Sequence, residues 1–464
     1  MAAGRKLALL GGTTSWGDCR VALRYLARPR RAVEGRSIVA YEDAFARLVG
    51  VRFAYSFAAG RVGLYGLLQA FGVRAGDEVL LSAPTHIVVA NAVRYLGARP
   101  VYVDCDPENC NMDLAQAAER VTSRTRALIL QHTFGVPADI EGALRLSRRH
   151  GLRLIEDCVH ALGATYRGRP VGSFGDAAFF STEETKTIST TMGGMAVTDD
   201  PAVASSMRAF QQGCARPGTS LTSRYLVKLM AYHVLTQPRL HRFSRGLYEA
   251  LGQRQPLPTP TSGDELQGRR PPAYEVRLAD AQAALGLRQL ERLPANVSHR
   301  RRIAAIYEKG LRALGARVPR PPADAAPSYV RYPVWVEDRA AAVRAMAPHV
   351  VLGTWFTSVL EEAVSPEHGG YEQGSCPRAE AAARHLVNLP THPRVRPDDA
   401  ERMLSALTPF VSRPATAGWR VGAAPAVQDR ASARAPSPAR RGEGLPNREP
   451  SAVAGEEGAG PASP

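Results

Sequence analysis

The feature that most constrains this fold is the alternation of short apolar runs with amphipathic segments between residues 55 and 212. Apolar runs bounded by turn residues predict buried strands, and apolar residues spaced by three or four positions predict helices. Strands and helices in alternation form a mostly parallel sheet with helices on its faces, so we expect an α/β fold. The expected strands cover 78–83, 100–104, 127–131, 152–157, 177–181 and 195–198, and the expected helices cover 87–96, 114–121 and 140–150.

The remainder of the 464 residues differs in composition and predicts a chain of several parts. We expect an N-terminal segment over 1–40, a large α/β domain over 41–213, an insertion over 214–272, a small α+β domain over 273–411 and a tail over 412–464. The tail is rich in Ala, Pro, Arg, Gly and Ser and has almost no aromatic residues, so we expect it to be disordered.

The insertion and the small domain show weaker patterns. A basic amphipathic stretch over 224–251 predicts a packing or dimer-contact helix, with a membrane-surface helix as the alternative. The Pro- and Gly-rich stretch over 255–270 predicts a flexible loop. In the small domain the periodicity predicts helices over 278–293, 300–314 and 339–346, and a strand over 329–336.

The net charge is +16, from 59 basic and 43 acidic residues. These charges are spread along the chain, and no basic run is interleaved with aromatic residues, so we expect attraction of anionic small substrates rather than nucleic acid binding. The apolar run over 7–10 is too short for a signal peptide or a membrane span. The six cysteines form no CxxC pair, which favours a reducing cytoplasm and no metal site.

Two residues at predicted strand ends, an acid and an amine, are candidates for binding a cofactor. Asp157 ends the apolar strand in IEDCVHALGA (155–164), and Lys186 follows the next strand in STEETK (181–186). Loops after parallel strands meet in one crevice. A cofactor with an aldehyde, a pyridine ring and a phosphate needs an amine that forms an imine with the aldehyde, a carboxylate for the pyridine nitrogen and donors for the phosphate. In the alternative interpretation Asp157 only caps a helix and Lys186 lies on the surface.

The ordered set of motifs resembles the DegT-type (DegT/DnrJ/StrS) sugar aminotransferases, which are fold type I enzymes dependent on pyridoxal phosphate. The resemblance extends from Tyr41 to about Pro409 and includes GRVGL (60–64), PTH (84–86), EDCVHALGA (156–164) and QAALGLRQL (282–290). It implies a Schiff base at Lys186, a bond from Asp157 to the pyridine nitrogen, His160 beside the phenolic oxygen, Ser181, Gly60 and Arg61 at the phosphate, and His86 stacked on the ring.

Several positions depart from the family pattern or keep a second interpretation. Arg61 replaces a more usual Thr and is long enough to reach the substrate instead of the phosphate. His160 has the alternative of a core histidine, and His86 stacks less well than an aromatic residue. Glu275 stands where the family has an asparagine from the neighbouring subunit, and a carboxylate would repel a phosphate.

The resemblance implies an aminotransferase that moves an amino group from L-glutamate to a keto sugar, normally a nucleotide-linked one. It also implies a homodimer with the active site at the subunit interface. Two alternatives remain open: an enzyme acting on a cyclitol or another cyclic ketone, and a cofactor-binding regulatory protein without turnover. Related sugar dehydratases lack the lysine, so Lys186 disfavours that activity.

Overall fold

The computed structural model describes residues 5–9, 12–241, 244 and 261–413, all of which belong to one compact unit. The tail expected over 412–464 lies outside the described residues from 414 onward. Residues 255–260 of the loop expected over 255–270 and the end of the stretch expected over 224–251 also lie outside them. The rest of that expected loop is described and contains the short helix α10, Gly263–Leu266, so the expectation of a loop is wrong there.

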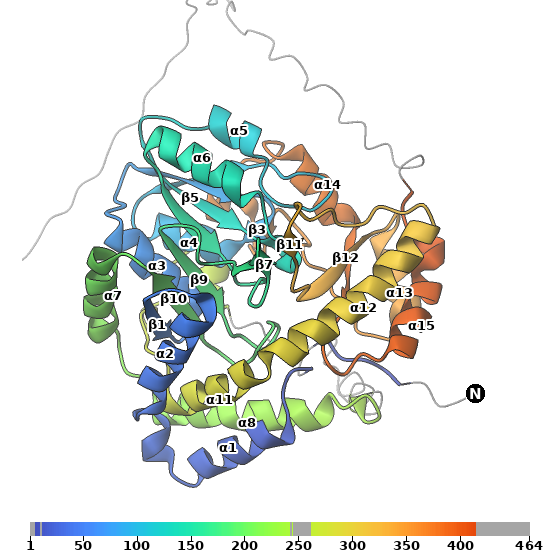
Figure 1. The fold of residues 1–464 in the computed structure, drawn as a ribbon, viewed down its shortest axis with the longest axis horizontal. Coiled ribbons are helices and arrows are strands. Elements are labelled where there is room, and N and C mark those ends of the chain that lie inside the picture. The colour runs from blue at the N-terminus through green and yellow to red at the C-terminus, as the bar shows by residue number, and fades with distance from the viewer. Residues whose placement is uncertain (1–4, 10–11, 242–243, 245–260, 414–464) are drawn as a thin grey trace, which may run out of the picture. The chain divides into compact units, whose positions relative to one another are not determined.

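A seven-stranded sheet forms the centre of the fold (Figure 1). Its strand order is β1-β10-β9-β6-β5-β2-β4, and only β10 runs antiparallel to its neighbours. This confirms the expected α/β fold with a mostly parallel sheet. The strands are β1 Phe53–Phe57, β2 Glu78–Ser82, β4 Arg99–Val103, β5 Thr125–Gln131, β6 Arg153–Asp157, β9 Ala177–Ser181 and β10 Gly194–Thr198.

Both faces of the sheet are buried, which explains why its strands are continuous apolar runs. In β2, Leu80 packs in one core, and Val79 and Leu81 pack in the other. One face is covered by α3, α4 and α7, and the opposite face by α2, α5, α6 and α11. Their bounds are α2 Ser37–Val49, α3 Gly60–Ala70, α4 Ile87–Arg94, α5 Leu114–Glu119, α6 Ile140–His150, α7 Pro201–Gly213 and α11 Asp280–Glu291.

Local signals in the sequence define the ends of these helices. In α6, the side chain of Asp139 accepts the N–H of Gly142 at the start, and Gly151 ends the helix with a positive φ of 65°. The side chain of Asp200 caps α7, where Pro201 occupies the first turn. Such caps bond N–H groups that have no partner within the helix.

A smaller α+β layer packs around a two-stranded antiparallel sheet of β12 and β14. Its core contains Tyr307, Tyr332 and Leu389, and Leu7 from the start of the chain packs into the same core. Leu7 also forms a bridge with Val350. The elements are α12 Leu293–Ala313, β12 Arg331–Trp335, α13 Arg339–Met346, α14 Pro377–His385, β14 Leu386–Pro390 and α15 Pro397–Leu407.

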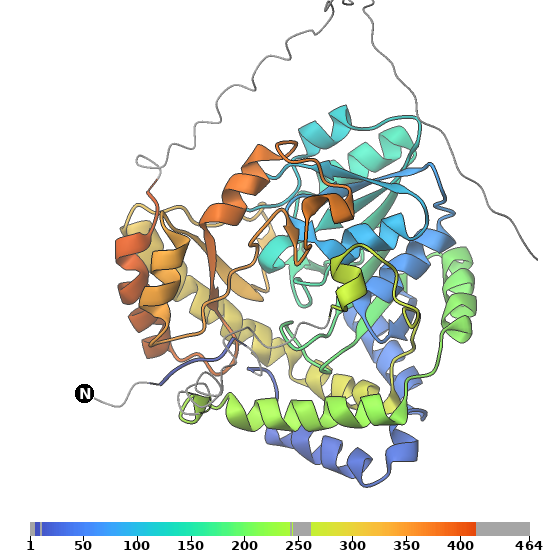
Figure 2. The same ribbon diagram turned by 180° about the vertical axis from the view of Figure 1, so that it is seen from behind.

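Two helices differ from the expected pattern. The helix expected over 300–314 begins at Leu293, because Pro294 lies in the first turn, where a proline leaves no N–H unsatisfied. The basic stretch forms α8 Thr219–Leu235, which begins before the expected position at 224. It lies beside α1 Trp16–Leu26 (Figure 2).

The remaining elements are short. Helix α2 includes residue 41, so the limit expected there between the N-terminal segment and the large domain falls inside a helix. The expected domain limits stay predictions. The short elements are β3 Thr85–His86, β7 Thr165–Tyr166, β8 Arg169–Pro170, β11 Ala325–Ala326, β13 Leu360–Glu361, α10 Gly263–Leu266 and the 3-10 turns η1 Pro29–Ala32, η2 Thr133–Gly135, η3 Pro366–Gly369 and η4 Thr408–Phe410.

Candidate active site

A cavity of about 490 Å³ opens at the carboxyl edge of the sheet. Asp157 ends β6, Ser181 ends β9, and Gly60 begins α3 after β1. The structure therefore brings together residues that lie far apart in the sequence. All seven candidate site residues line this cavity: Gly60, Arg61, His86, Asp157, His160, Ser181 and Lys186.

Asp157 and Lys186 face the cavity with opposite charges and perturbed pKa values. Asp157 is 1% exposed; its Oδ1 accepts the N–H of Val159 at 3.1 Å, and its Oδ2 has no partner among the described residues. Burial raises the pKa of Asp157 to about 6, although the positive charge of Lys186 opposes this rise. Burial also lowers the pKa of Lys186 to about 8. A buried carboxylate oxygen without a donor fits a ligand that brings one, such as a protonated pyridine nitrogen.

The start of α3 forms a cradle for an anion beside Ser181. A helix start presents N–H groups without intrahelical partners, and these attract phosphate. A Cβ at position 60 would lie 2.8 Å from the carbonyl oxygen of Phe180, so only glycine allows the helix to begin this close to β9. The hydroxyl of Ser181 accepts the N–H of Glu183 at 3.3 Å, which leaves its own proton available for a ligand. The cradle therefore fits the phosphate of the expected cofactor.

Arg61 lines the cavity, but its guanidinium is paired with an acid from the insertion. Its Nε lies 2.5 Å from Oε1 of Glu265, whose side chain is only 2% exposed. Glu265 also closes a capping box with Ser262 at the start of α10. The positive charge of Arg61 is thus largely balanced by the protein, and a role at the phosphate stays a prediction.

The two histidines are oriented by backbone N–H groups. In His86, Nδ1 accepts the N–H of Val88 at 3.3 Å, and Nε2 lies 3.2 Å from a carboxylate oxygen of Glu362. In His160, Nδ1 accepts the N–H of Phe134 at 3.4 Å. Burial and the charge of Lys186 lower the pKa of His160 well below its usual value, so the ring is neutral. A neutral ring that accepts at Nδ1 carries its proton on Nε2, which makes His160 a donor.

Sequence reasoning missed several residues that line the same cavity. Arg331 and Trp355 come from the small layer, where no motif marks them, although Arg331 is a lone charge in an otherwise apolar strand. Glu275, singled out as a departure, pairs with Arg270 and is absent from the lining. Four carboxylates also line the cavity: Glu183, Glu184, Glu361 and Glu362.

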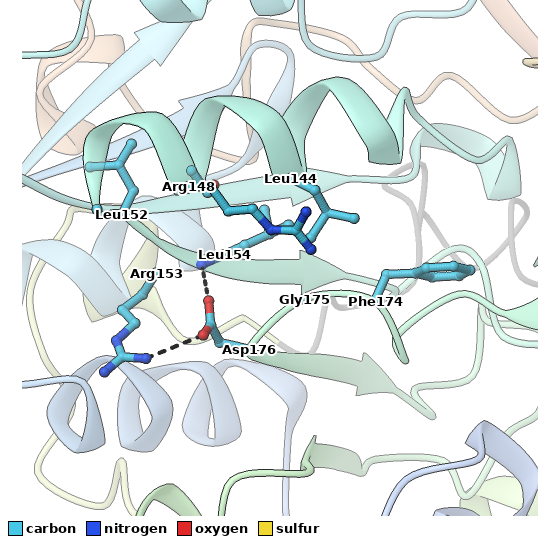
Figure 3. A pocket seen from close by; sticks show the side chains of 10 residues that line it. Leu144, Arg148, Leu152, Arg153, Leu154, Phe174, Gly175 and Asp176 are labelled. Carbon is cyan, nitrogen blue, oxygen red and sulfur yellow. Dashed lines mark hydrogen bonds and ion pairs between the residues drawn. The ribbon is translucent and has the colours of Figure 1, made fainter.

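A second hollow lies on the surface between α6 and β6, away from this chemistry (Figure 3). It shares no lining residue with the cavity. Its acid, Asp176, accepts the N–H of Leu154 at 2.7 Å and pairs with Arg153 at 3.2 Å, so the carboxylate is already engaged in the structure. We assign this hollow no function.

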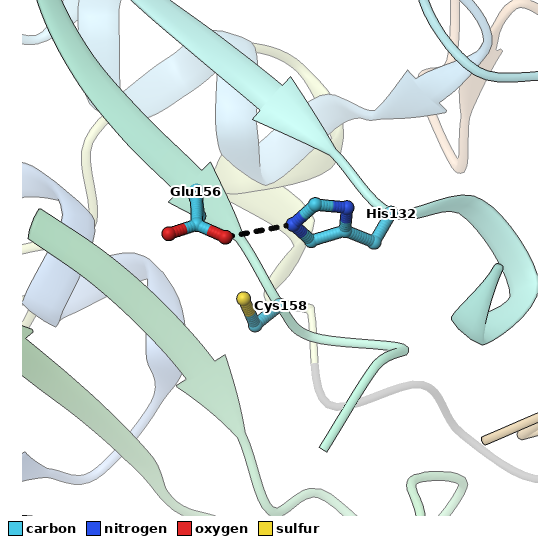
Figure 4. A group of neighbouring side chains, drawn as sticks. All are labelled: His132, Glu156 and Cys158. Atoms are coloured by element: carbon cyan, nitrogen blue, oxygen red, sulfur yellow. Dashed lines mark hydrogen bonds and ion pairs between the residues drawn. The ribbon is translucent and has the colours of Figure 1, made fainter. Parts of the chain in front are cut away.

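His132, Glu156 and Cys158 form a buried cluster at the carboxyl ends of β5 and β6 (Figure 4). Nδ1 of His132 accepts the N–H of Ala138 at 3.0 Å, and Nε2 lies 3.1 Å from Glu156. Burial alone would raise the pKa of Glu156, but bonds from His132 and from backbone N–H groups lower it. Because both ring nitrogens of His132 are engaged, the cluster acts as a hydrogen-bonded support for β6.

The fold and the amine–carboxylate pair define the class of the protein as a fold type I transferase that uses pyridoxal phosphate. The chain belongs to the DegT/DnrJ/EryC1/StrS aminotransferase family, whose model matches residues 20–408. It is a transaminase, and its cofactor is pyridoxal 5'-phosphate. The resemblance noted in the sequence is confirmed.

Several known proteins are similar over most of the chain. GDP-perosamine synthase of Caulobacter vibrioides is 32% identical over 378 residues, which cover 80% of this chain and 90% of that protein. UDP-N-acetyl-3-dehydro-alpha-D-glucosamine 3-aminotransferase of Acidithiobacillus ferrooxidans is 29% identical, covering 81% and 88%. Among solved structures, DesV of S. venezuelae is 27% identical with a TM-score of 0.66, covering 85% and 94%. No helix in the described part of the chain has the length and apolar character of a membrane span.

Proposed function

We propose that this transaminase moves the amino group of L-glutamate to a nucleotide-linked keto sugar. The observation that carries the proposal is the meeting of Lys186 and the unpartnered oxygen of Asp157 in one cavity. The similar proteins from Caulobacter vibrioides and Acidithiobacillus ferrooxidans, whose names refer to GDP- and UDP-linked sugars, support the acceptor. We also propose a homodimer that works in the cytoplasm, in keeping with six free, buried cysteines.

The residues divide the chemistry among themselves. When bound, pyridoxal phosphate supplies an aldehyde carbon that exchanges amino groups and a ring that takes up electrons from the reacting carbon. The carboxylate of Asp157 would keep the pyridine nitrogen protonated. Lys186, with its pKa lowered to about 8, would move a proton to and from the reacting carbon as general base and acid. Nε2 of His160 would donate to an oxygen on the ring, and Ser181 with the start of α3 would hold the phosphate.

The carboxylates of the cavity suit a polyhydroxylated acceptor, because each carboxylate oxygen accepts hydrogen bonds from hydroxyl groups. They also favour one alternative, a cyclitol or another cyclic polyol ketone. Five acids, two arginines, one lysine and three histidines line the described cavity. This balance of charge does not select for a diphosphate. A panel of nucleotide-linked keto sugars and cyclic ketones, each tested with glutamate, separates the two acceptor classes.

Lys186→Ala tests the central assignment. We expect the variant to fold, to lose the visible absorbance of the lysine-bound cofactor, and to lose turnover. Glutamate added to the wild-type holoenzyme should shift that absorbance, which a non-catalytic regulatory protein would not show. Turnover retained by the Lys186→Ala variant would contradict the proposal.

A further inference from the structure

Arg331 is a buried cation that forms no ion pair with another described residue. It begins β12, is 4% exposed, and lines the cavity that contains Lys186. Its guanidinium has no hydrogen bond or ion pair with any other described residue. Burial lowers its pKa only to about 10, so it is charged at neutral pH. A buried, unpaired charge is costly, which indicates that an anionic ligand normally completes the site.

The guanidinium of Arg331 and the amine of Lys186 both lie against the ring of Trp355. The guanidinium carbon of Arg331 lies 3.5 Å from the centre of the Trp355 ring, and Nζ of Lys186 lies 4.3 Å from it. The ring of His160 stacks on Trp355 with a centroid distance of 4.6 Å. The two cations are therefore close enough for one small ligand to contact both. A guanidinium stacked on an aromatic ring keeps its N–H groups directed sideways, in the fork that matches a carboxylate.

We propose that Arg331, held over Trp355, binds the α-carboxylate of the amino donor. This inference rests on the proposed function. In an α-amino acid a single carbon separates the amino nitrogen from the carboxylate. When the amino group reaches the position of the Lys186 amine, the carboxylate must lie a few ångströms away. Because both groups lie against the ring of Trp355, the guanidinium carbon of Arg331 is within about 8 Å of Nζ of Lys186, a span that an α-amino acid can bridge.

The diphosphate of a nucleotide-linked acceptor fits this position less well. It is joined to the sugar through the anomeric oxygen, so several bonds separate it from the carbonyl that reacts near Lys186. The nearby acids do not block the site. Glu183 and Glu361 favour the charged form of Arg331 but lie beyond ion-pair distance. Glu361 accepts the hydroxyl of Thr357 at 2.9 Å.

The test compares L-glutamate with its α-amide as donors to the holoenzyme. The cofactor absorbance is followed in the donor half-reaction alone. We expect the wild type to prefer glutamate, and Arg331→Gln to lower kcat/KM for glutamate by about 10- to 100-fold while changing the rate with the amide little. Arg331→Lys should restore only part of the preference, because lysine lacks the fork. Arg317→Gln is the control, since Arg317 lies over the ring of Trp335, outside the cavity.

A binding measurement does not depend on turnover. Glutarate, a dicarboxylate that cannot react, should bind the wild-type holoenzyme in calorimetry and bind Arg331→Lys at least several-fold more weakly. An unchanged preference in Arg331→Gln, equal glutarate affinities, or a defect confined to the acceptor half-reaction would overturn the Arg331 site and leave transamination standing. A wild type that reacts with no α-amino acid would instead overturn the proposed function together with the site.

Discussion

At the scale of single residues, the active site shifts the pKa values of Asp157 and Lys186 away from those of the free side chains. Burial pushes Asp157 toward its neutral form and Lys186 toward its neutral form, and each charge partly offsets the other effect. Such paired perturbations are typical of catalytic groups, because a protein tunes them by desolvation and neighbouring charge. The bound cofactor would offset the cost of burying these two charged groups.

Asp157→Asn tests the carboxylate. The amide has nearly the same shape but no charge, so a pyridine nitrogen loses the partner that keeps it protonated. We expect kcat to fall by about 10²- to 10³-fold, the range expected when one member of a buried charge pair is removed. Steady-state kinetics and the cofactor spectrum measure the effect. A kcat within a few-fold of the wild-type value would remove Asp157 from its role.

Lys186→Met tests the electrostatic cost of the amine in the cofactor-free protein. The folded pKa of about 8 lies below the ordinary value of 10.5, so the unfolded chain binds more protons between those limits. Wild-type stability should therefore rise as pH increases from about 8 to 10. The variant should be more stable by about 1–2 kcal/mol at pH 7 and should lack this rise, a range discounted because the amine keeps some exposure.

Urea unfolding at pH 7 and pH 9.5 compares the two proteins. Equal pH dependence in both would show that the lysine is not desolvated as the structure indicates.

The residues predicted from sequence share one property: each lies at the end of a strand, in the loop after it, or in the first turn of the next helix. Local patterns place such residues at one edge, which is why Asp157, Ser181 and Lys186 could be found. Arg331 and Trp355 could not, because they enter the site from the small layer through long-range packing. The pairing of Arg61 with Glu265 also depends on how the insertion folds back.

At the scale of elements, the start of α3 has little tolerance for a larger residue. Gly60→Ala would place a Cβ 2.8 Å from the carbonyl oxygen of Phe180 and force the helix away from β9. We expect the cofactor to bind about 10- to 100-fold more weakly, because small displacements of positioning groups carry large costs. Fluorescence titration of the cofactor measures this. Gly213→Ala is the control, since nothing lies within 4 Å of a Cβ there.

The bonds around Glu156 hold β6 to the loop before β9. Glu156 accepts the N–H groups of Gly172, Phe174 and Gly175 as well as His132. Its pKa is lowered, so its contribution is present above pH 4.5 and is lost as pH falls through the folded value. Glu156→Gln should cost about 2–4 kcal/mol in urea unfolding at pH 7 and flatten the acid dependence.

Glu308→Gln, which breaks a surface pair with Arg312, is the matched control and should cost less than about 0.5 kcal/mol. A similar small loss in Glu156→Gln would mean that the cluster gives β6 little support.

Elements were predicted best where strands and helices alternate and worst at the start of the chain. Six of the seven strands of the large sheet lie within two residues of their expected ends, whereas β1 was not predicted. No helix was predicted for α1, whose apolar side meets α8 and α11 only after the insertion has folded back. An amphipathic pattern reports a buried face but does not identify the element that buries it.

At the scale of the whole molecule, α1 and α8 present apolar side chains to solvent. Trp16 and Leu23 on α1 are 61% and 56% exposed, and Val227 on α8 is 51% exposed. Exposed apolar residues gathered on neighbouring helices are typical of interaction surfaces. Light scattering should therefore give twice the 50.0 kDa mass of the chain, and Val227→Glu should weaken the dimer by about 10-fold or more.

Val364→Glu, at a position that is 66% exposed on another part of the chain, should leave the mass unchanged. A monomer with full activity would exclude the proposed homodimer.

The bridge between Leu7 and Val350 has a consequence for biosynthesis. Ala8 and Leu9 line the cavity, and the carbonyl of Ala8 lies 2.9 Å from the ring nitrogen of His392. These contacts can form only after the ribosome has translated almost all of the folded unit. Residues 7–9 must therefore wait for the segments around residues 350 and 392, and a nascent chain stalled before residue 350 would lack part of the cavity wall.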